Sequence, residues 1–244
     1  MTAAGERLFA RYAHQPNERG YCGPEGADGL AAVARGEAAS VSVPDVARRF
    51  SGAWPYLTVV GDLLGVDPLD ERAVRAYWTG SAEGDALDAD EVWRRLVAII
   101  GPQAGSYWTH LDDRLAAEAA PHHAFHVFGV YPWTRLLDTG LPEPVQVLAD
   151  CSVVPARVRE VVDDGCLVDA PALHYADGSL AWGDAVPRRV AVPYGDELAV
   201  GDAVTVHWDA VCERIDDADA AALAARLASQ LERVNARLAA ALPR

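Results

Sequence analysis

Lysine is missing from this chain, and its cysteines are few and unpaired. All basic residues other than histidine are arginines. Together with the abundance of alanine, we interpret this as a compositional bias of the genome that carries no function. The four cysteines, at positions 22, 151, 166 and 212, stand far apart, and no C-x-x-C pair occurs. These spacings exclude a small disulfide-stapled secreted fold and a zinc knuckle.

Long apolar runs and clusters of positive charge are missing as well. No run approaches the roughly 18 apolar residues that a membrane-spanning helix needs. The first residues, MTAAGERLFARYAH, lack the apolar core of a secretory signal. The net charge is −15, whereas binding to nucleic acid or to an anionic membrane surface requires clustered cations. We therefore expect a cytoplasmic protein with no membrane span and no nucleic-acid partner.

The chain also lacks the signatures of common enzyme classes. It has no Walker loop, no Rossmann glycine pattern, no G-x-S-x-G and no zinc-protease helix. Ordinary hydrolase and kinase activities are therefore without support, and a role other than catalysis is favoured.

What is present begins with a helical region of 149 residues. Turn-forming Pro and Gly residues divide it into segments with apolar residues at helical spacing. Pro55 falls inside one of these segments and should kink that helix or split it in two. Residues 80–85 read as a loop. The expected helices cover about 3–13, 25–36, 43–60, 67–78, 88–100 and 104–118, and a further helix starts at Pro121.

The pattern changes after residue 150. Short runs rich in Val are separated by the hairpin signals Asp163-Asp-Gly165 and Asp177-Gly178, which predicts five or six short strands. Short strands of this kind avoid exposed edges by closing into a small barrel. From Asp216 or Asp217 onward, Leu and Val recur every three or four residues, which predicts one long amphipathic helix. We expect an α+β chain: an N-terminal all-α domain, residues 1–149, followed by a small OB-like β-barrel with a long C-terminal helix, residues 150–244.

Cys151 and His207 bracket this β-rich region. Cys151 precedes the first expected strand, and His207 ends a later one. In a small barrel both positions fall at a rim. A thiolate and an imidazole form either a soft metal site or a nucleophile–base pair. The alternative is a buried cysteine and an unrelated surface histidine.

Two sequence stretches resemble signatures of the HypC/HupF hydrogenase-maturation chaperones. Residues 151–158, CSVVPARV, are similar to the N-terminal signature of that family. Residues 200–216, VGDAVTVHWDAVCERID, are similar to its second signature. The resemblance covers the region after residue 150, and its two parts occur in the family's order.

The resemblance implies a small barrel with a C-terminal helix and a specific cargo. Such chaperones hold the iron–dicyanide–carbonyl fragment of nickel–iron hydrogenases together with a scaffold protein, and they deliver it to the hydrogenase large subunit. The family's cysteine and histidine correspond to Cys151 and His207. This chain departs from the family because Cys151 is internal, with no free amine, and because Trp208-Asp209 replaces the usual glycine after the histidine.

A second constellation, consisting of His122, His123 and His126, lies in the helical region. On a helix, His122 and His126 would share one face, a spacing that metal-binding helices use. Cys22, His110 and Asp112 are candidates for a further ligand. Capping and packing by the histidines is the alternative interpretation. This part of the chain, including FHVFGVYPW, resembles an actinobacterial family associated with hydrogenase loci.

Three functions thus stay open at the sequence level. The first is a metallochaperone or assembly factor that binds an iron fragment through Cys151 and His207 and recognises a client protein. The second is a metal- or haem-dependent enzyme whose site includes His122 and His126. The third is an adaptor that kept the barrel and binds no metal.

Overall fold

The computed structural model describes residues 3–24, 29–38, 41–103, 111 and 113–241. They form two compact units. The first unit comprises residues 1–111, 119–123 and 193–195, and the second comprises 112–118, 124–192 and 196–244. Residues 124–149, which the sequence grouped with the helical region, therefore belong with the strands.

The described part of the first unit consists of helices joined by turns and loops. Several of its helix starts follow from the sequence because a polar side chain caps the first turn: Ser42, Asp70 and Asp88 each accept hydrogen bonds from backbone N–H groups of the following helix. The helices are α1 (Ala3–Glu18), α2 (Gly29–Arg35), α3 (Val43–Ala47), α4 (Trp54–Leu64), α5 (Glu71–Trp78), α6 (Ala82–Asp85), α7 (Ala89–Ile100) and the 3₁₀ turn η1 (Gly101–Gln103).

One local prediction is confirmed in this unit and two need adjustment. The run 43–60 is split in two, as expected, and Pro55 lies in the first turn of α4, where its missing N–H costs nothing. The first helix continues to Glu18 through Pro16 instead of ending at residue 13. The loop expected at 80–85 contains the short helix α6, which Ser81 caps. The cap at Ser81 therefore accounts for the helix in place of the expected loop.

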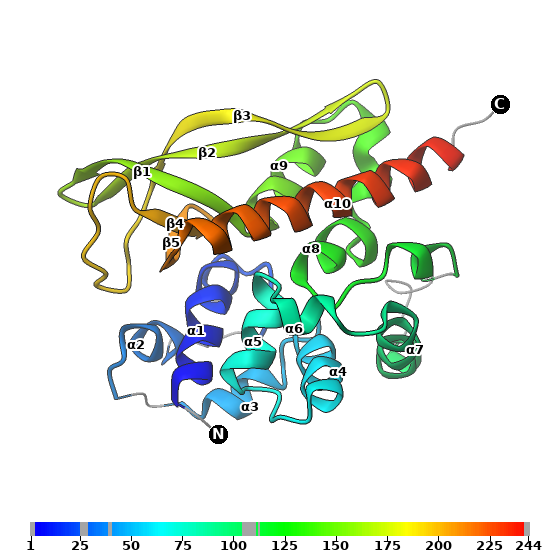
Figure 1. Cartoon of the computed structure of the whole chain (residues 1–244), viewed down its shortest axis with the longest axis horizontal. Helices are drawn as coiled ribbons and strands as arrows, with labels where there is room; N and C mark the ends of the chain where they lie inside the picture. Colours follow the sequence, from blue (N-terminus) through cyan, green and yellow to red (C-terminus); the bar gives the residue numbers. More distant parts are fainter. Residues whose placement is uncertain (1–2, 25–28, 39–40, 104–110, 112, 242–244) are drawn as a thin grey trace. The chain divides into compact units, whose positions relative to one another are not determined.

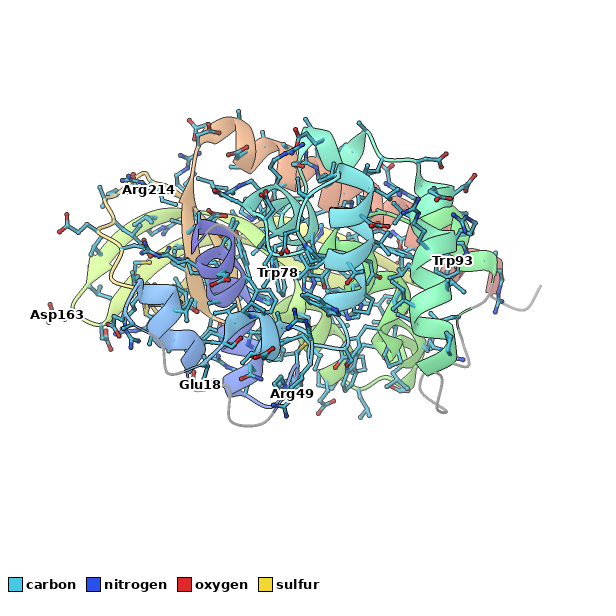
Figure 2. The ribbon with its side chains drawn as sticks, turned by 90° about the horizontal axis from the view of Figure 1, so that it is seen from below. Glu18, Arg49, Trp78, Trp93, Asp163 and Arg214 are labelled. Atoms are coloured by element: carbon cyan, nitrogen blue, oxygen red, sulfur yellow. The ribbon has the colours of Figure 1, made fainter. Side chains whose placement is uncertain are left out.

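Aromatic side chains build the core of the first unit. Tyr12 of α1 stacks on Trp78 of α5, with ring centroids 5.4 Å apart. Trp78, which is labelled in Figure 2, is buried. Helix α1 approaches the start of α5 closely at Gly5. A Cβ at this position would lie 2.0 Å from the carbonyl oxygen of Leu69. Glycine is therefore required there by the backbone contact.

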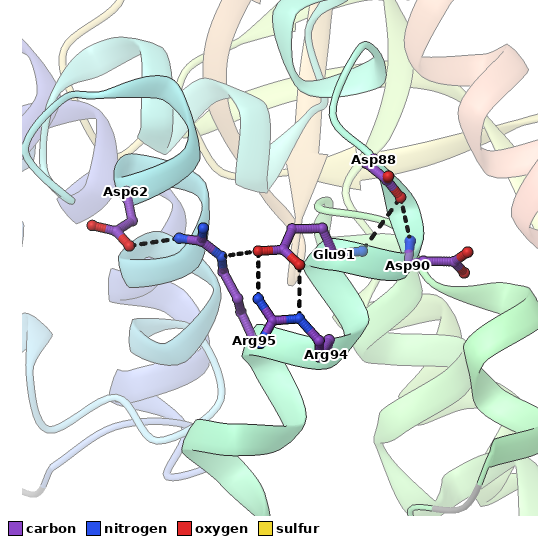
Figure 3. A network of polar contacts seen from close by, with 6 residues as sticks. All are labelled: Asp62, Asp88, Asp90, Glu91, Arg94 and Arg95. Atoms are coloured by element: carbon purple, nitrogen blue, oxygen red, sulfur yellow. Dashed lines mark hydrogen bonds and ion pairs between the residues drawn. The ribbon is translucent and has the colours of Figure 1, made fainter.

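Arginine links two of these helices at the surface. Arg95 of α7 donates to Asp62 of α4 at 2.7 Å and to Glu91 at 2.6 Å (Figure 3). Arg94 also donates to Glu91, and the two guanidinium groups lower the pKa of the Glu91 carboxyl to about 2. Exposed pairs of this kind orient helices but stabilise them little.

In its described part, the second unit contains the strands, five helical segments and the end of a sixth. Its long helix α10 contacts β1, β3 and β4 (Figure 1). The chain enters it through η2 (Asp113–Glu118) and, at Ala124, through α8 (His123–Phe125). The other elements are the π-helix η3 (His126–Val130), the 3₁₀ helix η4 (Pro132–Thr139), α9 (Glu143–Cys151), β1 (Val154–Val162), β2 (Gly165–Ala176), β3 (Ser179–Val190), β4 (Ala203–His207), β5 (Ala210–Ile215) and α10 (Asp217–Ala241).

The strands form one antiparallel sheet in the order β3-β2-β1-β4-β5. Both predicted hairpin turns are confirmed, and Asp177 and Gly178 have the positive φ angles that a tight two-residue turn needs. Strands β2 and β3 are longer than expected, because β2 runs on past Pro171 through a register shift.

The closed barrel is not confirmed. Among the described residues, the two edge strands meet through one isolated bridge, between Ala191 and Ala210, instead of a continuous ladder. The mixed α+β character and the long C-terminal helix are present as expected.

Helix α10 covers the sheet with its predicted apolar face. Asp216 accepts a hydrogen bond from the N–H of Asp219 and so caps the helix. The side chain of Asn235 bonds both the N–H and the carbonyl of Leu180 in edge strand β3, which satisfies part of that edge. None of the described helices is long and apolar enough to cross a membrane. The buried residues of the apolar face are Leu223, Leu227, Leu231 and Val234.

Candidate functional site

Cys151 is the last residue of α9, at the point where the chain turns into the sheet. The buried face of this helix consists of Pro144, Val147, Leu148 and Cys151. The next residue, Ser152, is extended, and its hydroxyl donates to the carbonyl of Leu148 at 2.7 Å. This bond satisfies a carbonyl at the helix end, and β1 begins two residues later.

His207 is the last residue of β4, in which all five residues are buried. The tight turn to β5 consists of Trp208 and Asp209, whose φ angles are 50° and 58°. Left-handed backbone is costly for a bulky side chain such as tryptophan. Trp208 is nevertheless buried, so its packing holds the turn in this conformation. The position of His207 is therefore set by the ladder on one side and a strained turn on the other.

The structure brings the segments of Cys151 and His207 together at one end of the sheet. Strands β1 and β4 are antiparallel, and Val154 pairs with Val206. From this pair towards the end of the sheet, the segment before Val154 leads back to Cys151, and the residue after Val206 is His207. Beyond them, the backbone N–H of Trp208 donates to the carbonyl of Asp150 at 3.2 Å. The two predicted ligand positions thus lie on adjoining segments.

Arg188 of β3 joins the same two segments. Its guanidinium donates to Asp150 at 3.1 Å and to Asp209 at 2.7 Å. Asp150 also accepts from Gln146 in α9 at 2.9 Å. One arginine therefore contacts the carboxylates that stand beside Cys151 and just beyond His207.

Both candidate ligands are withdrawn from solvent. Cys151 is 9 % exposed and His207 is 2 % exposed. In the described part of the chain, no group of three or more His, Cys, Asp or Glu residues has the arrangement of a metal site. A metal at this place would therefore take at most two ligands from these side chains and the rest from elsewhere.

The other cysteines are placed differently. Cys166 and Cys212 are fully buried in β2 and β5, as expected for small core residues. Cys22 lies in the loop after α1 in the first unit, where the Asn17 amide donates to its carbonyl at 2.8 Å. Burial raises the pKa of the Cys22 thiol to about 11, so at neutral pH it is a thiol and a poor nucleophile.

His122 and His126 do not share a regular α-helix. His122 precedes α8, and His126 begins the π-helix η3. The two residues belong to different compact units. His126 stacks on Tyr131, and burial lowers the pKa of its imidazole to about 4. Their suggested partners His110 and Asp112 lie outside the described residues.

His123, which the sequence placed in the same cluster but not among the expected ligands, has a defined partner in the first unit. Its Nδ1 is 3.0 Å from the hydroxyl of Tyr77, and its ring also lies against Trp78 with centroids 4.6 Å apart. His123 is buried, so this arrangement fits the packing interpretation of the histidine cluster.

A buried ion pair in the second unit also escaped prediction. Arg237 of α10 pairs with Glu118 of η2, and it donates to the carbonyl of Phe128 in η3 at 3.0 Å. The amide of Gln230 donates to the Glu118 carbonyl at 3.2 Å. Burial raises the pKa of the Glu118 carboxyl, although Arg237 opposes the shift. Two features of the sequence could have indicated this pair. One is a single Glu in the otherwise apolar run LAAEAA, and the other is the polar pair Gln230 and Arg237 on one face of the terminal helix.

Comparisons with known proteins place the chain by family and go no further. No curated protein and no solved structure matches it. One family model matches residues 1–241, which include the helices of the first unit, the sheet and all of the described part of α10. The chain therefore belongs to the family described as a family of unknown function, DUF6390.

Proposed function

We propose that this protein is a metallochaperone or assembly factor that holds an iron fragment through Cys151 and His207 and passes it to a client protein. The observation that carries the proposal is the meeting of their two segments at one end of the sheet, marked by the hydrogen bond between Trp208 and Asp150. The sequence separates Cys151 and His207 by 56 positions, and the antiparallel pairing of β1 with β4 brings their segments together.

The chemistry of the pair suits such a cargo. A thiolate is a soft ligand and an imidazole binds iron well. Two protein ligands leave the remaining positions of the iron to cyanide and carbonyl. The iron fragment is cargo in this proposal and leaves with the client.

The likeness to hydrogenase-maturation chaperones extends the proposal to fold and partners. Strands β1–β5 and α10 would then correspond to the OB-like barrel and terminal helix of those proteins. The bridge between Ala191 and Ala210 would mark the place where the barrel closes. The partners would be a maturation scaffold and the large subunit of a nickel–iron hydrogenase in the cytoplasm. The helical first unit would recognise the client.

Burial sets a requirement on loading. Cys151 is 9 % exposed and His207 is 2 % exposed, so a fragment with several small ligands reaches them only when their cover moves. We propose that the turn at Trp208 and Asp209 provides this movement. Its left-handed backbone stores strain, which lowers the cost of opening.

The same burial favours a second candidate, an adaptor that binds no metal. In an adaptor, Cys151 and His207 are core residues, and the protein works through its surfaces alone. Within the described residues, no group of three or more His, Cys, Asp or Glu residues has the arrangement of a metal site.

One purification separates the two candidates. The chain is produced anaerobically together with hydrogenase-maturation proteins, and bound iron is measured along with the infrared bands of cyanide and carbonyl. The metallochaperone predicts iron with these bands in the wild type and in Cys22→Ala, and loss of both in Cys151→Ala and His207→Ala. Iron-free wild-type protein would rule out the metallochaperone and leave the adaptor.

A further inference from the structure

We infer that Arg188 is the positioning residue of the Cys151–His207 site, because it holds together the two chain segments that carry these side chains. The inference deepens the proposed function. Its prediction about metal binding rests on that proposed function. Its structural part, the effect of Arg188 on the accessibility of Cys151, is measured without any metal.

The contacts of Arg188 reach both segments. On one side it bonds Asp150, which directly precedes Cys151. On the other side it bonds Asp209, two residues after His207. The side chains of Arg188 and Asp150 are 25 % and 14 % exposed, so this half of the bridge is shielded from solvent. Asp209 is more open, at 52 %.

Backbone bonds make the bridge part of a three-way junction. Trp208 donates to Asp150. Just after β3, Ala191 donates to the carbonyl of Asp209 at 2.8 Å and accepts from Val211 at 2.9 Å. Arg188 itself is held in register by its place opposite Val168 in the β2–β3 ladder. The end of α9, the end of β3 and the turn after β4 therefore meet at this arginine.

Electrostatics give the direction of the effect. Asp150 and Asp209 bond the same guanidinium, and without it two carboxylates would face each other across the junction. Like charges in a partly shielded place repel. Removal of Arg188 should therefore separate the segments, loosen the turn at Trp208 and uncover Cys151.

The neighbouring residue supplies a matched control. Arg189 lies one position further along β3, so its side chain points to the other face of the strand. It pairs with Asp164 at the β1–β2 hairpin, and both side chains are mostly exposed. Arg189→Ala removes the same charge from the same strand and leaves the junction intact.

The first measurement is the rate at which iodoacetamide alkylates Cys151 in the metal-free full chain, followed by peptide mass spectrometry. We expect Arg188→Ala to raise this rate about fivefold or more, and Arg189→Ala to leave it unchanged. Cys166 and Cys212, both fully buried, report on general unfolding and should stay protected. An unchanged rate at Cys151 in Arg188→Ala overturns the inference.

A milder variant decides the matter if Arg188→Ala unfolds, which labelling of Cys166 and Cys212 would reveal. Arg188→Lys keeps the positive charge but lacks the planar guanidinium group, which can donate to two carboxylates at once. It should label Cys151 faster than the wild type while Cys166 stays protected. Labelling at the wild-type rate in this variant also overturns the inference.

The second measurement is titration with cobalt(II), a spectroscopic probe whose thiolate charge-transfer band reports ligation by Cys151. Arg188→Ala should weaken cobalt binding about fivefold or more, with Arg189→Ala at the wild-type affinity. Equal affinities in both variants overturn the metal-binding part. A wild type without a Cys151-dependent band counts against the proposed function, whereas the labelling result still decides whether Arg188 positions Cys151.

Discussion

The backbone N–H of Trp208 donates to the backbone carbonyl of Asp150 at 3.2 Å. This bond joins the residue after His207 to the residue before Cys151, and it lies outside the regular ladder between β1 and β4. A turn built from Trp208 and Asp209 with left-handed backbone makes it possible. The geometry of the proposed site therefore depends on a local irregularity at the end of the sheet.

His126 should make the protein acid-sensitive. Burial lowers the pKa of its imidazole from the usual 6.5 to about 4, so the folded state keeps the ring neutral while the unfolded state binds a proton more readily. The stability that follows is present above pH 6.5 and is lost as the pH falls towards 4. Between pH 6.5 and 5 the free energy of unfolding should drop by on the order of 2 kcal/mol through this residue.

Denaturant unfolding at a series of pH values checks this expectation. His126→Gln should flatten the pH dependence over that range. His14 adds a slope of the same sign, because burial also lowers the pKa of its imidazole, so His14→Gln serves as the second variant. A wild type equally stable at pH 6.5 and pH 5 would contradict the buried neutral state of both histidines.

The Glu118–Arg237 pair should respond unequally to loss of its two partners. Arg237→Ala leaves the carboxylate of Glu118, whose side chain is 2 % exposed, without its main counter-charge. Breaking a buried pair in this way typically costs about 3–5 kcal/mol. Glu118→Gln removes the buried charge itself and should cost clearly less, because Arg237 is more exposed and keeps its bond to the carbonyl of Phe128.

Urea unfolding of both variants measures the difference. Arg94→Ala is the surface control, because its side chain is 68 % exposed and its partner Glu91 retains Arg95. It should change stability little. Equal losses in Arg237→Ala and Glu118→Gln would show that the charge on Glu118 has no special cost.

Gly5→Ala should destabilise the first unit. A Cβ at Gly5 would lie 2.0 Å from the backbone oxygen of Leu69, and backbone cannot move aside as a flexible side chain can. Overpacking of this kind costs roughly 1–3 kcal/mol. Gly101→Ala is the matched control, because a Cβ there would lie 3.8 Å from its nearest neighbour. Thermal unfolding followed by circular dichroism compares the two, and equal midpoints would contradict the close approach of α1.

The thiol of Cys22 should react slowly with alkylating agents. Burial raises the pKa of its thiol from 9.0 to about 11, so its thiolate fraction at pH 8 is about a hundredfold below that of an ordinary cysteine. Its alkylation rate, followed by peptide mapping, should climb steadily up to pH 10, with Cys22→Ser as the assignment control. A plateau near pH 9 would show that the thiol is not withdrawn from water.

Features controlled by neighbouring residues were accessible from the sequence. Asp88 caps α7, Asp216 caps α10, and the turns at Asp163-Asp-Gly165 and Asp177-Gly178 connect strands as expected. Each depends on a side chain that bonds backbone a few residues away or on a tight turn that suits glycine. The apolar face of α10 follows in the same way from the spacing of its leucines.

Features controlled by distant residues were not accessible. The stretch after Pro121 reads as one helix, but it folds as a three-residue α-turn and a π-helix. Arg237 reaches that π-helix from a position 109 residues away. Likewise, β2 and β3 run through Pro171 and Gly183 because they pair with each other, and local propensity alone would have ended them.

The sequence by itself determined the α+β composition, the helix caps, the hairpin turns and the choice of Cys151 and His207 as residues with ligand chemistry. The tertiary structure alone decided that these residues lie on adjoining segments, that both are buried, and that Arg188 bridges the acids beside them. The physical reason is range: capping and turn formation act over a few residues, whereas burial and ion pairing depend on which distant segments the sheet places side by side.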